Sequence, residues 1–304
     1  MDEKESSREK LIEKFNIQNK LPNNLKSSQQ ILEKSIEEKI FCCCLDYDLT
    51  ISEYKSYNDL KKKVIPSYDK NNPIHENALH QLFSKTKKII NKDKESSDFI
   101  SNITNITTSS INSSNNNINI NIKDEDSIIW RKIGFQTGNP RTDFRAGGIF
   151  SLDVMNYFVN NHEKEYINMI NEEYFTFALV CIRLSHLIRI YLYLLYSEDI
   201  KISLKYQKNI LASRKELKIF CYFLYDNNNL LFDIISVGLK FIYQKFLEQK
   251  KNVNKEINYL IIDPIIVSSI QCLKNSLNNA NIQDNDIISQ LKERYREFFL
   301  KNLK

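Results

Sequence analysis

Glycine is rare in this chain, and its distribution is the feature that most constrains the fold. Only five of the 304 residues are glycine, and four of these lie within residues 130–153, WRKIGFQTGNPRTDFRAGGIFSLD, which also holds the single tryptophan. Glycine is favoured where the backbone takes a positive φ or where another segment approaches closely. Asn139 followed by Pro140 adds a further turn signal. The stretch therefore predicts an ordered, non-helical segment, and the LDVMNYF that follows predicts the start of a helix, with Ser151 as its cap.

This stretch is also basic. Before LDVMNYF begins, it carries one carboxylate, that of Asp143, against four cationic side chains: Arg131, Lys132, Arg141 and Arg145. A helix N-terminus has a partial positive charge, so a basic loop that faces one suits an anionic partner.

The order of residue types here resembles the signature of the ELMO domain, and specifically that of its ELMO-domain-containing (ELMOD) branch. The likeness is carried by GFQ, by the Asn-Pro pair, by TDFR and by the tryptophan, that is, by Trp130, Gly134, Phe135, Gln136, Asn139, Pro140, Thr142, Asp143, Phe144 and Arg145. Similar-looking helices lie on both sides, so the resemblance covers the chain from about residue 50 to its end.

The resemblance implies that the protein is not itself an enzyme but regulates one. ELMOD proteins act as GTPase-activating proteins for small GTPases of the Arf and Arl families, and the arginine of their TDFR sequence is the residue thought essential. On this chain that residue is Arg145, expected to act in trans as an arginine finger on the GTP-bound GTPase. A guanidinium stabilises the charge that develops during phosphoryl transfer, and its planar fork donates to two oxygens at once.

The other motif residues are interpreted as support for the loop. Trp130, Phe135 and Phe144 are expected to pack, and Gln136 is assigned to support because the GTPase is expected to supply its own water-positioning glutamine. Asp143 either orients Arg145 through a carboxylate–guanidinium contact or is only structural.

One departure from the family pattern follows the arginine. The family usually continues with glycine, a large apolar residue and glycine, whereas this chain has Ala146, Gly147 and Gly148. The change bears on the geometry of the finger.

Two other functions stay open. The ELMO scaffold branch binds a Rac exchange factor without an activating role, and residues 130–132 and 152–158 look somewhat like that branch. The retained TDFR favours the activator, as does the end at Lys304, which leaves no room for the lipid-binding domain and proline-rich tail of the scaffolds. The third function is a membrane-associated adaptor.

The adaptor hypothesis rests on Cys42, Cys43 and Cys44, which are candidates for S-acylation. The alternative is that they are small buried hydrophobic residues. Adjacent side chains on a helix diverge by about 100° and cannot close a tetrahedral metal site. No metal or other cofactor is expected.

Composition excludes several classes of function. A net charge of +5, with acidic and basic residues alternating, does not indicate nucleic-acid binding. Charged residues rather than an apolar run follow Met1, so a cytoplasmic protein is expected, with peripheral membrane association left open. Phosphate-binding loops, nucleophile elbows and zinc-binding motifs are absent from the sequence.

The pattern along the chain predicts an all-α fold of eight to ten helices in one ELMO-type domain. Residues 1–26 are expected to be a mobile charged arm, residues 27–93 the N-terminal helices, residues 94–122 a disordered Asn/Ser-rich linker and residues 123–304 the domain core. Local signals place helices at 73–92, after the Asn72–Pro73 pair, and from the Ser213–Glu216 capping box onward.

The run from Tyr174 to Tyr196 is apolar enough to raise the question of a membrane span. Arg183, His186 and Arg189 recur at every third position, which favours a central helix of a soluble bundle. This polar stripe is interpreted as a solvated face, with basic groups placed beside the motif as the alternative. Cys181, Cys221 and Cys272 are expected in the core.

Overall fold

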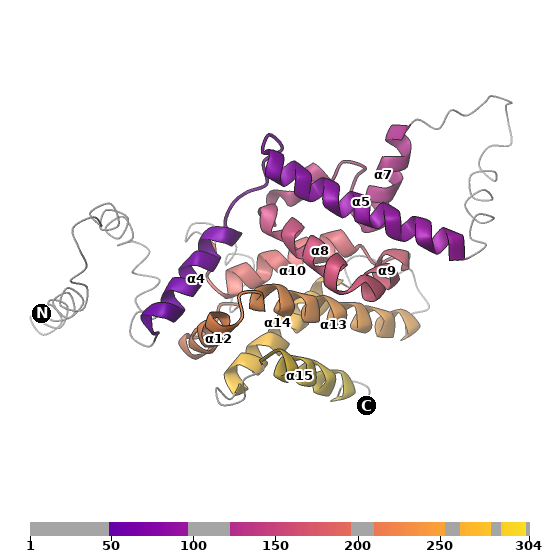
Figure 1. Cartoon of the computed structure of the whole chain (residues 1–304). Helices are drawn as coiled ribbons and strands as arrows, with labels where there is room; N and C mark the ends of the chain where they lie inside the picture. The colour runs from indigo at the N-terminus through magenta and orange to yellow at the C-terminus, as the bar shows by residue number, and fades with distance from the viewer. Residues whose placement is uncertain (1–48, 97–121, 196–209, 253–261, 281–286, 302–304) are drawn as a thin grey trace, which may run out of the picture. The chain divides into compact units, whose positions relative to one another are not determined.

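A computed structural model of the chain describes residues 49–96, 122–195, 210–252, 262–280 and 287–301 (Figure 1). Within these ranges the chain forms ten α-helices, one 3-10 helix and no strand, so the all-α prediction is confirmed. The elements are α4 (Ile51–Val64), α5 (Pro73–Ser96), α7 (Ile122–Ile133), η2 (Pro140–Arg145), α8 (Gly148–Asn161), α9 (Glu163–Asn171), α10 (Phe177–Tyr191), α12 (Arg214–Asp226), α13 (Leu230–Asn252), α14 (Ile262–Asn279) and α15 (Ile287–Lys301).

Some sequence-based predictions lie outside the described residues. These are the charged arm, the S-acylation candidates Cys42–Cys44, and residues 97–121 of the predicted linker. The helix predicted over 73–92 continues to Ser96, and the next described helix begins at Ile122.

The core is built around α10. Twelve of its fifteen residues are buried, and it packs against α8, α13 and α14 (Figure 1). Burial of apolar surface contributes about 25 cal/mol per Å², so a helix that is buried along most of its residues belongs at the centre of a bundle. Among the described residues, no helix is long and apolar enough to cross a membrane.

The polar stripe of α10 faces the bundle interior more than the prediction allowed. Arg189 is only 2% exposed, so its assignment to a solvated face is wrong. Arg183 is half-buried and pairs with Asp263 of α14, with Nε 3.2 Å from Oδ1. The stripe therefore makes contacts between elements.

Several helix starts follow local rules. The Asn72 Oδ1 accepts from the Ile74 backbone N–H at 2.9 Å, and α5 begins at Pro73. The predicted capping box at the start of α12 is present, with Glu216 N–H donating to Ser213 Oγ and Ser213 N–H donating to the Glu216 carboxylate. These side chains satisfy backbone donors that a helix leaves unpaired.

The start of α8 differs from the prediction. It begins at Gly148, and Ser151 lies inside its first turn with its hydroxyl donating to the Gly148 carbonyl at 3.0 Å. Gly148 takes a φ of +60°, which lets the chain leave η2 and enter α8 four residues earlier than expected. The prediction of Ser151 as the cap is wrong.

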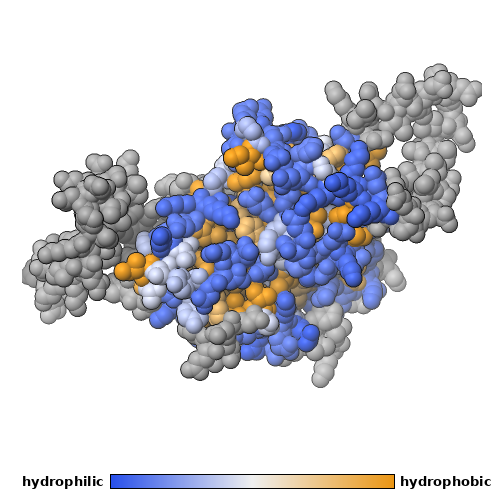
Figure 2. All heavy atoms as spheres, in the orientation of Figure 1, coloured by the Kyte–Doolittle hydropathy of each residue, from blue (hydrophilic) through white to orange (hydrophobic). Residues whose placement is uncertain are grey.

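The predicted core cysteines Cys181, Cys221 and Cys272 are all buried. Hydrophilic residues cover much of the face shown in Figure 2, with smaller apolar patches between them. Single exposed apolar side chains such as Ile51 and Ile74 are ordinary on a folded protein.

Candidate functional site

The motif stretch crosses three helices. Residues 130–133 close α7, residues 140–145 form η2, and α8 begins at Gly148. The prediction of a non-helical segment is therefore correct for residues 134–139 and wrong for TDFR, which lies in the 3-10 helix. The Asn139 side chain caps η2 by accepting from the Arg141 N–H at 3.3 Å, and Pro140 occupies the first helical turn.

Gly134 ends α7 in a conformation that other residues rarely adopt. Its φ is +98°, and its N–H donates to the Arg131 carbonyl at 2.9 Å, a glycine-terminated helix end. A Cβ at this position would lie 2.6 Å from the backbone nitrogen of Phe177, the first residue of α10. Glycine thus allows the end of α7 to touch the start of α10.

The departure after Arg145 proves compatible with the backbone. Ala146 has a φ of −87°, which any residue adopts, so glycine is not required there. The position with positive φ is Gly148, where the family pattern also has glycine. A Cβ on Gly148 would lie 2.6 Å from the Pro66 carbonyl oxygen.

A row of aromatic rings holds η2 in place. Phe144 is 1% exposed and stacks on Tyr68 with ring centroids 4.9 Å apart. Phe144 also meets Phe135 at 5.7 Å, Phe135 meets Trp130 at 5.5 Å, and Trp130 meets Phe83 of α5 at 5.0 Å. Such pairs contribute about 0.5–1.5 kcal/mol each beyond their buried area. The row connects η2 to α5 and α7, so the short helix has a fixed position.

Polar contacts fix the turn that precedes η2. The Asp143 Oδ2 accepts from the Gln136 N–H at 2.8 Å, and the Thr142 hydroxyl lies 3.2 Å from the Asn139 carbonyl. Asp143 and Arg145 form no ion pair in the described part of the chain, so the suggested orienting contact is not present there. Gln136 contributes its backbone N–H, while its side chain is exposed.

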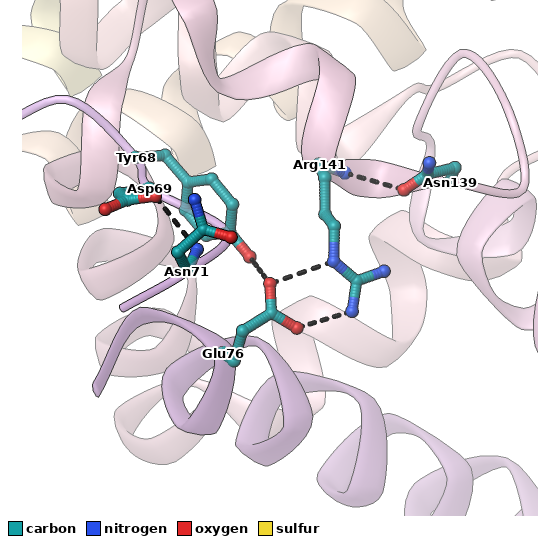
Figure 3. Close-up of polar contacts among 6 residues, drawn as sticks. All are labelled: Tyr68, Asp69, Asn71, Glu76, Asn139 and Arg141. Atoms are coloured by element: carbon teal, nitrogen blue, oxygen red, sulfur yellow. Dashed lines mark hydrogen bonds and ion pairs between the residues drawn. The ribbon is translucent and has the colours of Figure 1, made fainter. Parts of the chain in front are cut away.

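Arg141, the first arginine of η2, is held by α5. Its Nε lies 2.9 Å from Glu76 Oε1 and its Nη2 lies 2.5 Å from Glu76 Oε2 (Figure 3). The Tyr68 hydroxyl donates to the same Oε1 at 2.5 Å. The bond from Arg141 lowers the pKa of Glu76, and the bond to Glu76 raises that of Arg141. Burial first, and then Glu76, raise the pKa of the Tyr68 phenol.

Arg145, the second arginine of η2, is in a different state. Its side chain is exposed and makes no hydrogen bond or ion pair with any residue that the structure describes. A 3-10 helix has three residues per turn, so Arg141 and Phe144 share a face while Arg145 lies on the next one. Arg141 is therefore bonded to α5, whereas the side chain of Arg145 is exposed to solvent.

The sequence gives no indication that Tyr68 or Glu76 belongs to this site, and it places Arg189 beside the motif only as the alternative to a solvated face. Tyr68 and Glu76 lie more than sixty residues from Arg141, and no local signal pairs them. Arg189 of α10 contacts the motif through its Nη2, which donates to the Ala146 carbonyl at 2.5 Å. Its spacing with Arg183 and His186 was the only available signal.

The described residues hold no group of three or more His, Cys, Asp or Glu side chains that could bind a metal ion. What the site offers chemically is a guanidinium, presented on a short helix whose other side chains are engaged in packing or hydrogen bonds. Such a group can bind phosphate or carboxylate oxygens in a bidentate manner.

Comparison with known proteins gives two matches. A sequence model of the ELMO/CED-12 family matches residues 58–260, about two thirds of the chain. A curated relative, ELMO domain-containing protein A of Dictyostelium discoideum, is 41% identical over 44 residues, which are 14% of this chain and 4% of that protein. This chain thus spans a small part of that relative. No solved structure matches the chain.

Proposed function

The chain belongs to the ELMO/CED-12 family, and we propose that it is a GTPase-activating protein for a GTP-bound small GTPase of the Arf or Arl families. In this proposal Arg145 is the arginine finger. The protein regulates the hydrolysis carried out by the GTPase and has no catalytic cycle of its own. The proposal carries over the role of the family's TDFR arginine to the matching position of this chain.

The observation that carries the proposal is the contrast between the two arginines of η2. Arg141 is bonded to Glu76 through two nitrogens, whereas Arg145 is exposed and unpaired among the described residues. A finger must leave its own protein and reach another active site, which a guanidinium already bonded to a carboxylate could do only by breaking that contact.

The position of Arg145 on a fixed helix suits this role. Phe144 next to it is buried, and the capping bond from Asn139 orders the start of the helix. Only the side chain of Arg145 would therefore have to be ordered on binding, at about 0.5–1.5 kcal/mol for one flexible side chain. A finger of this kind raises hydrolysis by about 10³–10⁵-fold.

Single-turnover GTP hydrolysis by a panel of Arf and Arl GTPases tests the proposal. The wild-type protein is expected to accelerate at least one of them, and Arg145→Ala is expected to lower that acceleration about 10³-fold. Arg145→Lys keeps the charge but loses the planar fork, so it should recover only a small part of the rate.

Arg131→Ala is the matched control. Arg131 is also an exposed arginine of the motif, so its replacement changes the net charge equally. Equal losses in both alanine variants would indicate general electrostatic attraction and refute the finger. No acceleration by a folded wild-type protein, together with co-purification of a Rac exchange factor, would favour the scaffold, and acylation of Cys42–Cys44 without either result would favour the adaptor.

A further inference from the structure

Among the residues that the structure describes, Arg189 is the largest of the fully buried side chains, and it contacts the residue that follows Arg145. It belongs to α10 and is 2% exposed. Its Nη1 donates to the Val64 carbonyl at 2.8 Å and its Nη2 to the Ala146 carbonyl at 2.5 Å. The guanidinium carbon also lies 5.8 Å from the centre of the Phe150 ring.

Both carbonyls lie at the ends of helices. Val64 is the last residue of α4, and Ala146 is the residue that caps η2. Terminal carbonyls have no partner within their own helix and carry the negative end of its dipole. One buried cation therefore neutralises two helix ends, which would otherwise leave acceptors without donors inside the protein.

The segments that Arg189 bridges are also bonded to each other. The Ile149 N–H donates to the Pro66 carbonyl at 3.2 Å, and the missing Cβ of Gly148 leaves room for that carbonyl. On the far side, the Tyr57 hydroxyl of α4 donates to the Leu192 carbonyl at 2.8 Å, which ties α4 to the end of α10. The chain that follows Arg145 is thus held against α4 and α10 at once.

We propose that Arg189 is a positioning residue for Arg145: its two hydrogen bonds fix the peptide that follows Arg145 and so fix the direction in which the finger leaves the protein. This inference rests on the proposed function. Ala146 is the next residue in the chain, and neighbouring Cα atoms are about 3.8 Å apart. A shift of the Ala146 carbonyl therefore passes to Arg145 with little loss.

Arginine is suited to this place in a way that lysine is not. The planar guanidinium donates in two directions from fixed nitrogens and so can span two carbonyls, whereas an ammonium is a compact charge on a flexible stem. Arg189→Lys should keep the buried charge and most of the volume while losing the simultaneous contact with Val64 and Ala146.

The test compares Arg189→Lys with Arg183→Lys, a matched control six residues earlier on α10. Arg183 bonds to Asp263 of α14 and, among the residues that the structure describes, makes no hydrogen bond or ion pair with the motif. Thermal unfolding first establishes that both variants fold. Stimulated GTP hydrolysis is then measured against activator concentration, which separates the maximal rate from the half-saturating concentration.

Arg189→Lys is expected to lower the maximal rate about 10- to 100-fold, the effect of displacing a catalytic group by about 1 Å. The half-saturating concentration should change far less, because Arg189 is buried and cannot touch the GTPase. Hydrogen exchange of the peptide 146–150 should accelerate in the same variant, since the Ile149 amide lies at the bridged junction. Arg183→Lys should show neither change.

A folded Arg189→Lys protein with the wild-type maximal rate would overturn the inference while leaving the proposed function intact. Equal losses in the Arg183→Lys control would also overturn it, because they would indicate general weakening of α10. Wild-type protein that accelerates no GTPase would remove the proposed function, and unchanged exchange at 146–150 would separately show that Arg189 does not hold this segment.

Discussion

Replacing Gly134 by alanine should destabilise the fold where the end of α7 contacts the start of α10. The backbone at this residue has a φ of +98°, outside the range that residues with a Cβ tolerate, and such strain costs about 1–3 kcal/mol. The added Cβ would also lie 2.6 Å from Phe177 N and 2.6 Å from the Thr176 carbonyl carbon, both backbone atoms that cannot rotate away. Overpacking of this kind costs about 1–3 kcal/mol. The sum predicts a loss of about 2–6 kcal/mol in the free energy of unfolding.

Urea denaturation followed by circular dichroism measures this loss, with Gly238→Ala as the control. Gly238 lies inside α13, and a Cβ there would meet only the ends of the Leu184 and Ser269 side chains, at 3.1 and 3.2 Å. Alanine also gains about 0.5–1 kcal/mol over glycine in a helix, so this variant should stay within about 1 kcal/mol of the wild type.

Asparagine at position 134 separates the two causes of the loss. Asparagine tolerates positive φ better than alanine but carries the same Cβ, so the collision with the start of α10 remains. Gly134→Asn should therefore be destabilised nearly as much as Gly134→Ala. Recovery of wild-type stability by asparagine would refute the collision, and unchanged stability of the alanine variant would refute the reasoning altogether.

Two further predictions concern pH. Arg141 lowers the pKa of Glu76 below its ordinary 4.5. The pair therefore stabilises the fold above pH 4.5, and this contribution is lost as the pH falls through the lower pKa of the folded state. In Glu76→Gln, the urea midpoint should depend less on pH over this acid range. Burial, and then the charge of Lys240, lower the pKa of His162 below 6.5. As the pH falls, His162 therefore binds a proton in the unfolded chain before it does so in the folded protein, and the free energy of unfolding should decrease once the pH is below about 6.5. His162→Asn should remove that slope between pH 7 and 5.5, and an identical slope in the variant would contradict the assignment.

Much of the fold could be predicted because it follows from local rules. The apolar run at 174–196 predicts the helix that the structure has as α10, the Asn72–Pro73 pair locates the start of α5, and the Ser213–Glu216 box locates the start of α12. An asparagine before a proline predicts either a helix start or a turn. A helix start is predicted at Asn72 and a turn at Asn139, whereas the structure has a helix start after both, α5 and η2. A 3-10 helix of six residues is too short for apolar periodicity to reveal.

The organisation of the site depends on contacts that the sequence does not encode locally. Glu76 was one acidic residue among many on an amphipathic helix, and only the packing of α5 beside η2 brings it to Arg141. For Arg189, spacing alone could not distinguish an exposed stripe from a buried bridge, since both give a polar residue at helical intervals. Its burial is decided by α4 and by the residues after Arg145, which lie far apart in the chain.

The 3-10 geometry of residues 140–145 determines the directions in which Arg141 and Arg145 point. In an α-helix, residues four apart lie about 40° from each other around the axis, so Arg141 and Arg145 would face the same side. In a 3-10 helix the same two residues lie about 120° apart. Arg141 and Phe144 then share the face that meets Glu76 and Tyr68, as their contacts show. Conversion of residues 140–145 to an α-helix would therefore turn Arg145 towards the side of Glu76. The capping by Asn139 and the burial of Phe144 hold the segment in the 3-10 form, in which Arg145 is exposed.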